Sequence, residues 1–182
     1  LREFLQAFHA SGAAVGVLLP NATGVAVTFF ALQTTGRVPA MLNFTAGAAN
    51  VIAACKAANT SVVLTSRTFV EKGHFETLVQ AIEGVARVIY LEDIRATVTF
   101  FDRLKGLRQG GSAQVERNCN EPAAILFTSG SEGLPKGVVL SHRNLLANCA
   151  QSLTRVACNG SDKVFNALPV FHSFGLTAGL LM

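Results

Sequence analysis

One stretch decides how this chain is interpreted: Ile125-Leu126-Phe127-Thr128-Ser129-Gly130-Ser131-Glu132-Gly133-Leu134-Pro135-Lys136-Gly137-Val138-Val139-Leu140. A hydrophobic run enters a segment of glycine and hydroxyl residues that carries one lysine, and a second hydrophobic run leaves it. Because glycine permits unusual backbone turns, its N–H groups can crowd around an anion. The hydroxyl groups add donors, and Lys136 adds a positive charge. The stretch therefore predicts a strand–loop–strand unit suited to a nucleotide triphosphate.

This stretch is not the common phosphate-binding loop. That loop has the pattern G-x-x-x-x-G-K-[ST] and runs into a helix. Counting from Gly130, Pro135 stands at the second glycine position, and Gly137 follows the lysine. Val138 to Leu140 are β-branched or apolar and predict a strand instead. A glycine-rich hairpin without a ligand is the alternative, but it would need only two or three turn residues rather than about ten.

The stretch resembles the signature of the adenylate-forming superfamily, which includes acyl-CoA synthetases, luciferases and peptide-synthetase adenylation domains. The family pattern is roughly T-S-G-T-T-G-x-P-K-G, and Ser131 and Glu132 stand where it usually has threonines. A second family motif follows at Pro169–Gly175. The resemblance implies an α/β fold, the partial N-terminal domain of the adenylate-forming enzymes, with a mainly parallel sheet flanked by helices. The residues that match the first pattern are Thr128, Ser129, Gly130, Gly133, Pro135, Lys136 and Gly137.

Within the superfamily the chain is similar to one branch, from about Leu18 to Met182. This branch is the synthetase half of the bacterial bifunctional 2-acylglycerophosphoethanolamine acyltransferase/acyl-acyl carrier protein synthetase. The similar segments include 42–47, 90–93, 128–133 and 168–177. The resemblance implies a ligase that uses ATP and Mg²⁺ to form acyl-AMP from a fatty acid. The implied ligase would then transfer the acyl group to the phosphopantetheine thiol of acyl carrier protein.

Two other functions stay open. An acyl-CoA ligase is the first alternative, because nothing in these residues identifies the thiol acceptor. A non-catalytic nucleotide-binding or interaction module is the second. The parent would also acylate lysophosphatidylethanolamine, but no H-x-x-x-x-D pair for that chemistry is present here. A G-x-S-x-G nucleophile elbow is absent as well.

The resemblance assigns roles to individual residues. His172 is expected to position the substrate where the carboxylate and nucleotide pockets meet, with packing among aromatic residues as the alternative. Glu132 is expected to face solvent, because an ionised carboxylate repels phosphate and donates no hydrogen bond. The residues expected to bind ATP phosphates are Thr128, Ser129, Gly130, Ser131, Glu132, Gly133, Lys136 and Gly137. Those expected to line an acyl pocket are Phe171, Phe174 and Gly175, and no residue is assigned to a metal.

Composition limits the class of protein. Half of the 182 residues are hydrophobic and 14% are charged, so a sizeable core is expected. The net charge of +4 is scattered, which argues against a nucleic-acid partner. The one local concentration of basic residues, Arg103-Lys105-Arg108, is interpreted as a solvated helix face. The four cysteines, Cys55, Cys119, Cys149 and Cys158, have no zinc-site spacing and are interpreted as reduced thiols of a protein on the cytoplasmic side.

No segment has the roughly 18 uninterrupted apolar residues of a membrane span. A parent that handles phospholipid would lie at the inner membrane, through parts outside this chain. Both ends look like cuts within a longer polypeptide, and the family's later catalytic elements are missing. We therefore expect this piece to be inactive alone. His9 and His74 are expected at the surface, and His142 at a helix start.

Strands and helices alternate at short spacing, which predicts a parallel sheet with helices on both faces. Residues 1–108 are expected to form a first α/β subdomain, 109–121 a linker, and 122–182 the start of a second. Asn21 and Ser141 are predicted helix N-caps. Strands are predicted at 14–19, 38–42, 61–65, 86–91, 123–127, 138–140 and 164–168. Helices are predicted at 1–9, 21–33, 46–58, 75–82, 99–107 and 142–155.

Overall fold

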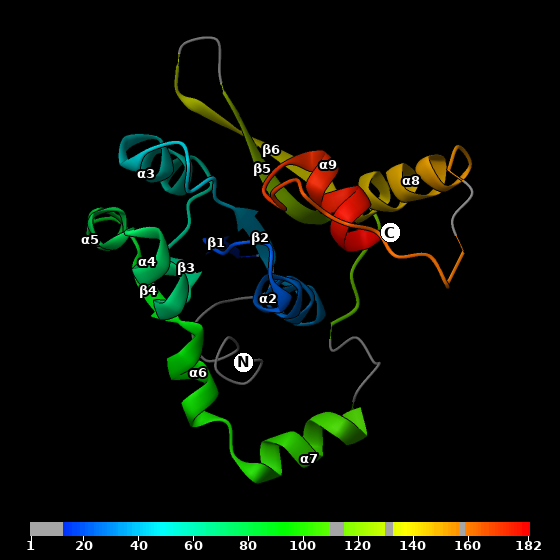
Figure 1. The fold of residues 1–182 in the computed structure, drawn as a ribbon, viewed down its shortest axis with the longest axis horizontal. Coiled ribbons are helices and arrows are strands. Elements are labelled where there is room, and N and C mark those ends of the chain that lie inside the picture. The colour runs from blue at the N-terminus through cyan, green and yellow to red at the C-terminus, as the bar shows by residue number, and fades with distance from the viewer. Residues whose placement is uncertain (1–12, 110–114, 130–132, 157–158) are drawn as a thin grey trace.

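The computed structural model describes residues 13–109, 115–129, 133–156 and 159–182 (Figure 1). In this part of the chain, six strands form one sheet in the order β4-β3-β1-β2-β5-β6. Neighbouring strands are parallel except for β5 and β6, which are antiparallel. The expected α/β fold with a mainly parallel sheet is confirmed. The strands are β1 (Ala14–Val17), β2 (Val38–Met41), β3 (Val62–Thr65), β4 (Arg87–Tyr90), β5 (Pro122–Ser129) and β6 (Pro135–Ser141).

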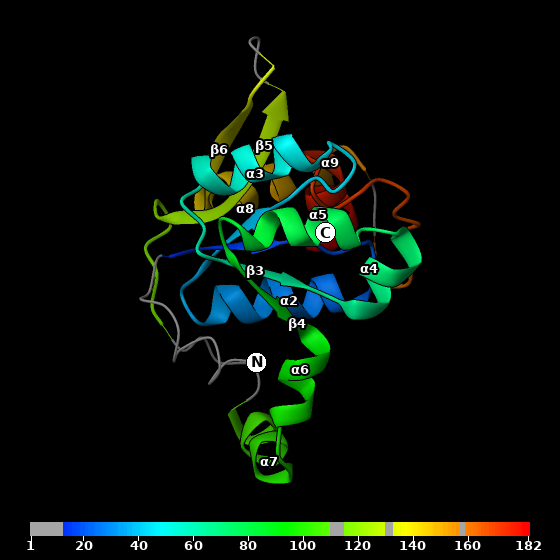
Figure 2. The same cartoon turned by 90° about the vertical axis from the view of Figure 1, so that its left-hand side faces the viewer.

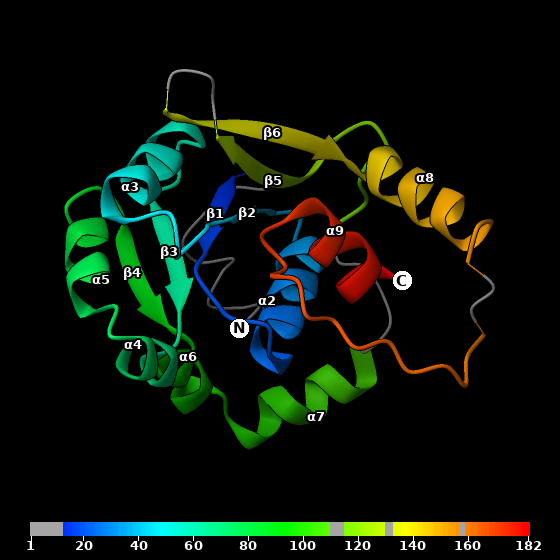
Figure 3. The same ribbon diagram turned by 45° about the horizontal axis from the view of Figure 1, so that its top comes forward.

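Helices flank this sheet on both faces (Figures 2 and 3). They are α2 (Thr23–Thr34), α3 (Ala48–Ala57), α4 (Arg67–Gly73), α5 (Glu76–Glu83), α6 (Leu91–Thr97), α7 (Phe100–Gln109), α8 (His142–Leu153), α9 (Ser173–Leu176) and the π-helical η1 (Thr177–Leu181). The short helices α4, α6, α9 and η1 were not predicted, and the helix expected at 1–9 lies outside the described residues. None of the helices described is long and apolar enough to cross a membrane.

The two faces of the sheet carry separate hydrophobic clusters. Successive side chains of a strand point to opposite faces, so β1 sends Val15 and Val17 to the face covered by α2. Val63 of β3 packs on the other face, beneath α3 and α5. Burying each such side chain contributes about 1.5–3 kcal/mol. This double coverage explains why the strands are short, continuous apolar runs.

The predicted linker 109–121 lies between α7 and β5, and the strands before and after it belong to one sheet. β5 pairs with β2 in parallel, with Ala40 opposite Ile125 and Met41 opposite Leu126. The side-chain amide of Gln33 on α2 also donates to the Ala123 carbonyl of β5. Residues on both sides of the linker therefore share backbone pairing, and a subdomain boundary at this point stays a prediction.

The strand predicted at 164–168 and the N-cap predicted at Asn21 are both wrong, and hydrogen bonds between Asn21 and residues 166–170 explain both. Residues 164–168 form no strand, and Val164 and Phe165 are 65% and 92% exposed, so nothing there buries a strand face. Asn21 does not cap α2, whose N-cap is Ala22 without a side-chain hydrogen bond. Instead the Asn21 side chain bonds to the backbone of 166–170.

The predicted cap of α8 is confirmed. The Ser141 hydroxyl accepts a hydrogen bond from the Asn144 N–H at 3.2 Å, and the Ser141 N–H donates to Asn144 Oδ1 at 3.0 Å. This is a capping box, which satisfies donors at the helix start. We expect Ser141→Ala to lower the free energy of unfolding by about 1 kcal/mol in urea titrations. Ser152→Ala within α8 is the control, and an equal loss in both variants would contradict the assignment.

Candidate functional site

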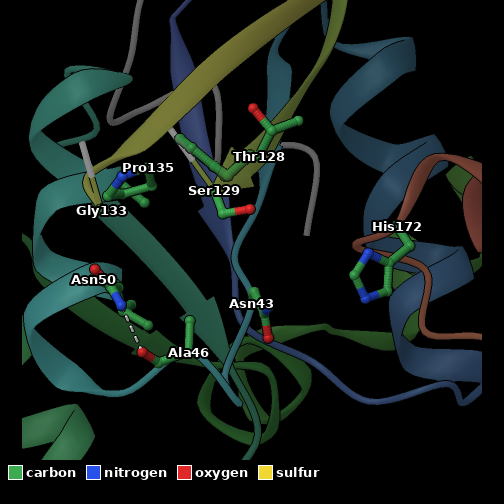
Figure 4. A pocket seen from close by; sticks show the side chains of 11 residues that line it. Asn43, Ala46, Asn50, Thr128, Ser129, Gly133, Pro135 and His172 are labelled. Atoms are coloured by element: carbon green, nitrogen blue, oxygen red, sulfur yellow. Dashed lines mark hydrogen bonds between the residues drawn. The ribbon is translucent and has the colours of Figure 1, made fainter. Parts of the chain in front are cut away.

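A cavity of about 370 Å³ opens at the carboxyl ends of β2 and β5 (Figure 4). These strands are parallel neighbours, so the segments that follow them meet at one edge of the sheet. Ligands of open α/β sheets bind at that edge. The cavity is lined by Asn43, Ala46, Asn50, Val51, Ala54, Phe127, Thr128, Ser129, Gly133, Pro135 and His172.

The first motif forms the end of a β-hairpin beside this cavity. Thr128 and Ser129 end β5, and they pair with Lys136 and Pro135 of β6. The strand–loop–strand prediction is confirmed, but the ten-residue loop 128–137 is wrong in extent, because both of its ends are paired strand. Only 130–134 connects the strands, and Gly133 has φ +78°, a conformation that favours glycine.

The structure brings together part of the predicted phosphate-binding set. Thr128, Ser129 and Gly133 line the cavity. Lys136 and Gly137 lie on β6 outside this lining, and Lys136 is exposed opposite Thr128. Directly opposite residues of an antiparallel pair share a face, so the Lys136 ammonium lies on the Thr128 side of the hairpin. Gly130, Ser131 and Glu132 lie outside the described residues, and so does the expected orientation of Glu132.

The opposite wall comes from residues to which the sequence assigned no role. Asn43 follows β2, and its Oδ1 accepts hydrogen bonds from the Thr45 N–H at 2.9 Å and the Thr45 hydroxyl at 2.7 Å. Asn50 donates to the Ala46 carbonyl at 2.9 Å, which ties the first turn of α3 to the cavity (Figure 4). In the sequence, segment 42–47 only resembles one branch of the superfamily. That resemblance is the sequence signal that could have identified Asn43 and Ala46 as part of this wall.

The electrostatics of the cavity favour an anion. Its described lining includes the polar, uncharged residues Thr128, Ser129, Asn43 and Asn50, and none of the lining residues is acidic. The N-terminal turn of α3 adds the positive end of a helix dipole. Neutral donors beside a helix start can hold phosphate oxygens without burying a counter-charge.

The second motif brings His172 to the same cavity. The His172 side chain points toward the cavity, across from the hairpin residues (Figure 4). Phe171, its neighbour, is 4% exposed and packs edge-on against Phe44 with ring centroids 5.1 Å apart. Phe44 also contacts Phe69 and Phe75. This aromatic cluster anchors the loop that carries His172 to the core.

The predicted acyl-pocket residues lie in different surroundings. Phe171 is in the core, whereas Phe174 is 67% exposed. Gly175 is buried, and a Cβ there would lie 2.2 Å from the Pro169 carbonyl oxygen, so the backbone approach requires glycine. None of the three lines the 370 Å³ cavity. Their acyl-binding role stays a prediction.

The described His and Cys residues other than His172 do not line this cavity, and His9 and Cys158 lie outside the described residues. His142 begins α8, where burial and then the charge of Arg117 lower its pKa, with Glu121 opposing. His74 is exposed, as expected. Cys55, Cys119 and Cys149 are free thiols. Within the described ranges, no group of three or more His, Cys, Asp or Glu side chains could hold a metal ion.

A second, mainly apolar cavity of about 660 Å³ lies between α2, α4 and α6. Glu92 at its edge accepts hydrogen bonds from the Ser66 hydroxyl at 2.6 Å and the Arg67 N–H at 3.0 Å. Burial alone would raise the pKa of Glu92, but these hydrogen bonds outweigh it and the pKa lies below its usual value. The carboxylate therefore ties the start of α4 to α6.

This depressed pKa predicts a pH dependence of stability. The stabilisation is present above the unfolded-state pKa of about 4.3 and is lost as the pH falls through the lower folded-state pKa. In urea titrations from pH 6 downward, Glu92→Gln should lose less stability on acidification than the wild type. Glu83→Gln, on exposed α5 surface, is the control. Parallel pH profiles for wild type and Glu92→Gln would contradict this assignment.

The family model for AMP-binding enzyme matches residues 3–182. The chain belongs to the AMP-binding enzyme family. It is 30% identical over 198 residues to 4-coumarate–CoA ligase 2 of Oryza sativa subsp. japonica, covering 99% of this chain and 35% of that protein. It is 27% identical to 4-coumarate–CoA ligase of Vanilla planifolia, covering 93% and 32%.

Solved structures share this fold. VinN in complex with 3-methylaspartate superposes with a TM-score of 0.81 at 23% identity, covering 99% of this chain and 48% of VinN. ATP-bound MatB from Rhodopseudomonas palustris gives a TM-score of 0.74 at 22% identity, covering 98% and 34%. The chain thus spans about a third of the length of the curated relatives it matches.

Proposed function

We propose that the full-length protein is an ATP-dependent acid–thiol ligase that activates a carboxylic acid as its adenylate and transfers it to coenzyme A. One observation carries the proposal: Thr128, Ser129 and Gly133 of the first motif and His172 of the second line one cavity. The names of the relatives support the acceptor, since those cited above are CoA ligases. The ATP-bound MatB structure supports the nucleotide.

The residues of the cavity suit the first half-reaction. A carboxylate oxygen would attack the α-phosphorus of ATP, and the bond to the bridging oxygen of pyrophosphate would break. The Thr128 and Ser129 hydroxyls and the Lys136 ammonium would stabilise charge on the departing phosphates. His172 would face the acid from the opposite side. These roles rest on the placement of the four side chains around one edge of the sheet.

Mg²⁺ would supply further charge neutralisation at the phosphates. The described cavity lining contains hydroxyls and amides but no carboxylate. These donors fit a nucleotide better than a dedicated cation site. Proteins usually hold Mg²⁺ through substrate phosphates and one or two carboxylates, so the ion would reach this cavity through ATP.

A fatty acid as substrate and acyl carrier protein as acceptor are the second candidate. It is supported by segments 42–47, 90–93 and 168–177, which resemble the acyl carrier protein synthetase branch. The relatives found support the coenzyme A acceptor better. The two candidates share the adenylation step; they differ in the thiol, and the second also specifies a fatty acid.

Acceptor choice is tested with the full-length enzyme. Palmitate or 4-coumarate is supplied with ATP and either coenzyme A or acyl carrier protein, and the thioester is measured. We expect thioester on coenzyme A. Thioester only on the carrier protein would replace the first candidate with the second. Nucleotide binding without adenylate from any acid would favour a non-catalytic nucleotide-binding module.

A further inference from the structure

We propose that Asn21 is a positioning residue that holds the His172 segment against the sheet edge; this inference rests on the proposed function. Asn21 follows β1, far from both motifs in sequence. Its side chain nevertheless makes three hydrogen bonds to the backbone just before His172. No motif of the sequence pointed to this role.

The three contacts use both ends of the Asn21 amide. The Nδ2 group donates to the Leu168 carbonyl at 2.7 Å and to the Asn166 carbonyl at 3.3 Å. Oδ1 accepts from the Val170 N–H at 3.0 Å. A primary amide has two donors and a carbonyl acceptor on one planar group, which suits alternating backbone carbonyls and N–H groups. Asn21 thus pairs with this segment much as a neighbouring strand would.

The segment needs such a partner because secondary structure does not hold it. Residues 163–168 have no strand or helix, and Val164 and Phe165 are largely exposed. The Asn166 side chain donates at 3.3 Å to the Gly175 carbonyl, so the segment is also bonded to α9. Buried Val170 and Phe171 follow directly. The irregular stretch is therefore fixed at its Asn21 contacts and by the core residues after them.

His172 is placed by the same contacts. Its N–H donates to the Pro169 carbonyl at 3.0 Å, and Pro169 lies between two residues bonded by Asn21. A shift of 168–170 would therefore move the His172 backbone and its imidazole at the cavity. Misplacement of a reacting group by about 1 Å can cost about 100-fold in rate. Asn21 would accordingly affect catalysis without contacting the substrate.

The test uses the full-length protein with Asn21→Ala, Asn21→Asp and the control Asn148→Ala on the exposed face of α8. Hydrogen exchange of peptides covering 166–172 reports whether the Asn21 contacts hold this segment. Acid-dependent ATP–pyrophosphate exchange reports kcat and KM, and imidazole NMR signals report the surroundings of His172. We expect faster exchange in Asn21→Ala and shifted His172 signals. We also expect kcat to fall roughly 10- to 100-fold with little change in KM for ATP.

Asn21→Asp separates the contacts, because it keeps the acceptor for Val170 but loses both donors. It should protect the 166–172 amides better than Asn21→Ala while still lowering kcat. If Asn21→Ala shows the same hydrogen exchange and the same kcat as Asn148→Ala, the inference is overturned. Faster hydrogen exchange with unchanged kcat would also overturn the inference, because the Asn21 contacts would then not position His172 for catalysis. If no acid supports activity in the wild type, the proposed function fails, and the His172 signals alone decide whether Asn21 positions that residue.

Discussion

Replacing Lys136 with alanine is expected to lower the rate of acyl-adenylate formation by a factor that corresponds to about 2–4 kcal/mol of transition-state stabilisation. Lys136 lies on β6 directly opposite Thr128, on the hairpin that borders the cavity. Negative charge grows on the departing pyrophosphate, and the Lys136 ammonium would stabilise it there. Rapid-quench measurement with radiolabelled ATP and saturating acid in the full-length enzyme gives this rate.

Two controls sharpen this prediction. Lys163→Ala removes another exposed lysine, which lies outside the β5–β6 hairpin, and should leave the rate unchanged. Lys136→Arg keeps the charge and should retain more activity than alanine. An alanine variant with weaker ATP binding but an unchanged adenylation rate would contradict the role of Lys136 in the transition state. It would favour simple nucleotide binding by the hairpin.

Phe171→Ala is expected to cost about 3–5 kcal/mol of stability, the usual loss for a buried phenylalanine. Phe171 is 4% exposed, and its ring packs edge-on against Phe44 at 5.1 Å. The cavity left behind would open in the aromatic cluster beneath His172. Urea unfolding followed by circular dichroism measures the loss, and adenylation should fall with it.

Phe165→Ala is the matched control, because Phe165 is 92% exposed. It should change the unfolding midpoint little. A Phe171→Ala midpoint close to that of the control would show that the aromatic cluster does not anchor the second motif. Phe171→Leu should recover part of the lost stability, since a large apolar side chain refills part of the space.

The strands and one cap could be predicted because their causes are local. Four-residue apolar runs such as Val62–Thr65 are buried on both faces, and that double burial is visible in the sequence. Ser141 satisfies N–H groups of its own helix, so its cap also depends on near neighbours. The two motifs were expected to share a site, and Thr128 and His172 line one cavity.

What the sequence missed depends on distant contacts. Asn21 has the chemistry of an N-cap, but its amide bonds to residues 166–170, about 147 positions away. Residues 164–168 have strand-forming composition, but the structure offers them a side chain in place of a neighbouring strand. The hairpin was also underestimated, because glycine, serine and proline suggest a loop locally while cross-strand pairing extends through Thr128 and Lys136. In each case tertiary pairing overrides local preference.

The most direct test of the account is ATP–pyrophosphate exchange by the full-length wild-type protein, with palmitate, 4-coumarate or no acid. The exchange requires that the acid and ATP react reversibly at one site, before any thiol acceptor takes part. The account predicts exchange that depends on an added carboxylic acid. ATP binding without exchange in the presence of any acid tested would contradict it.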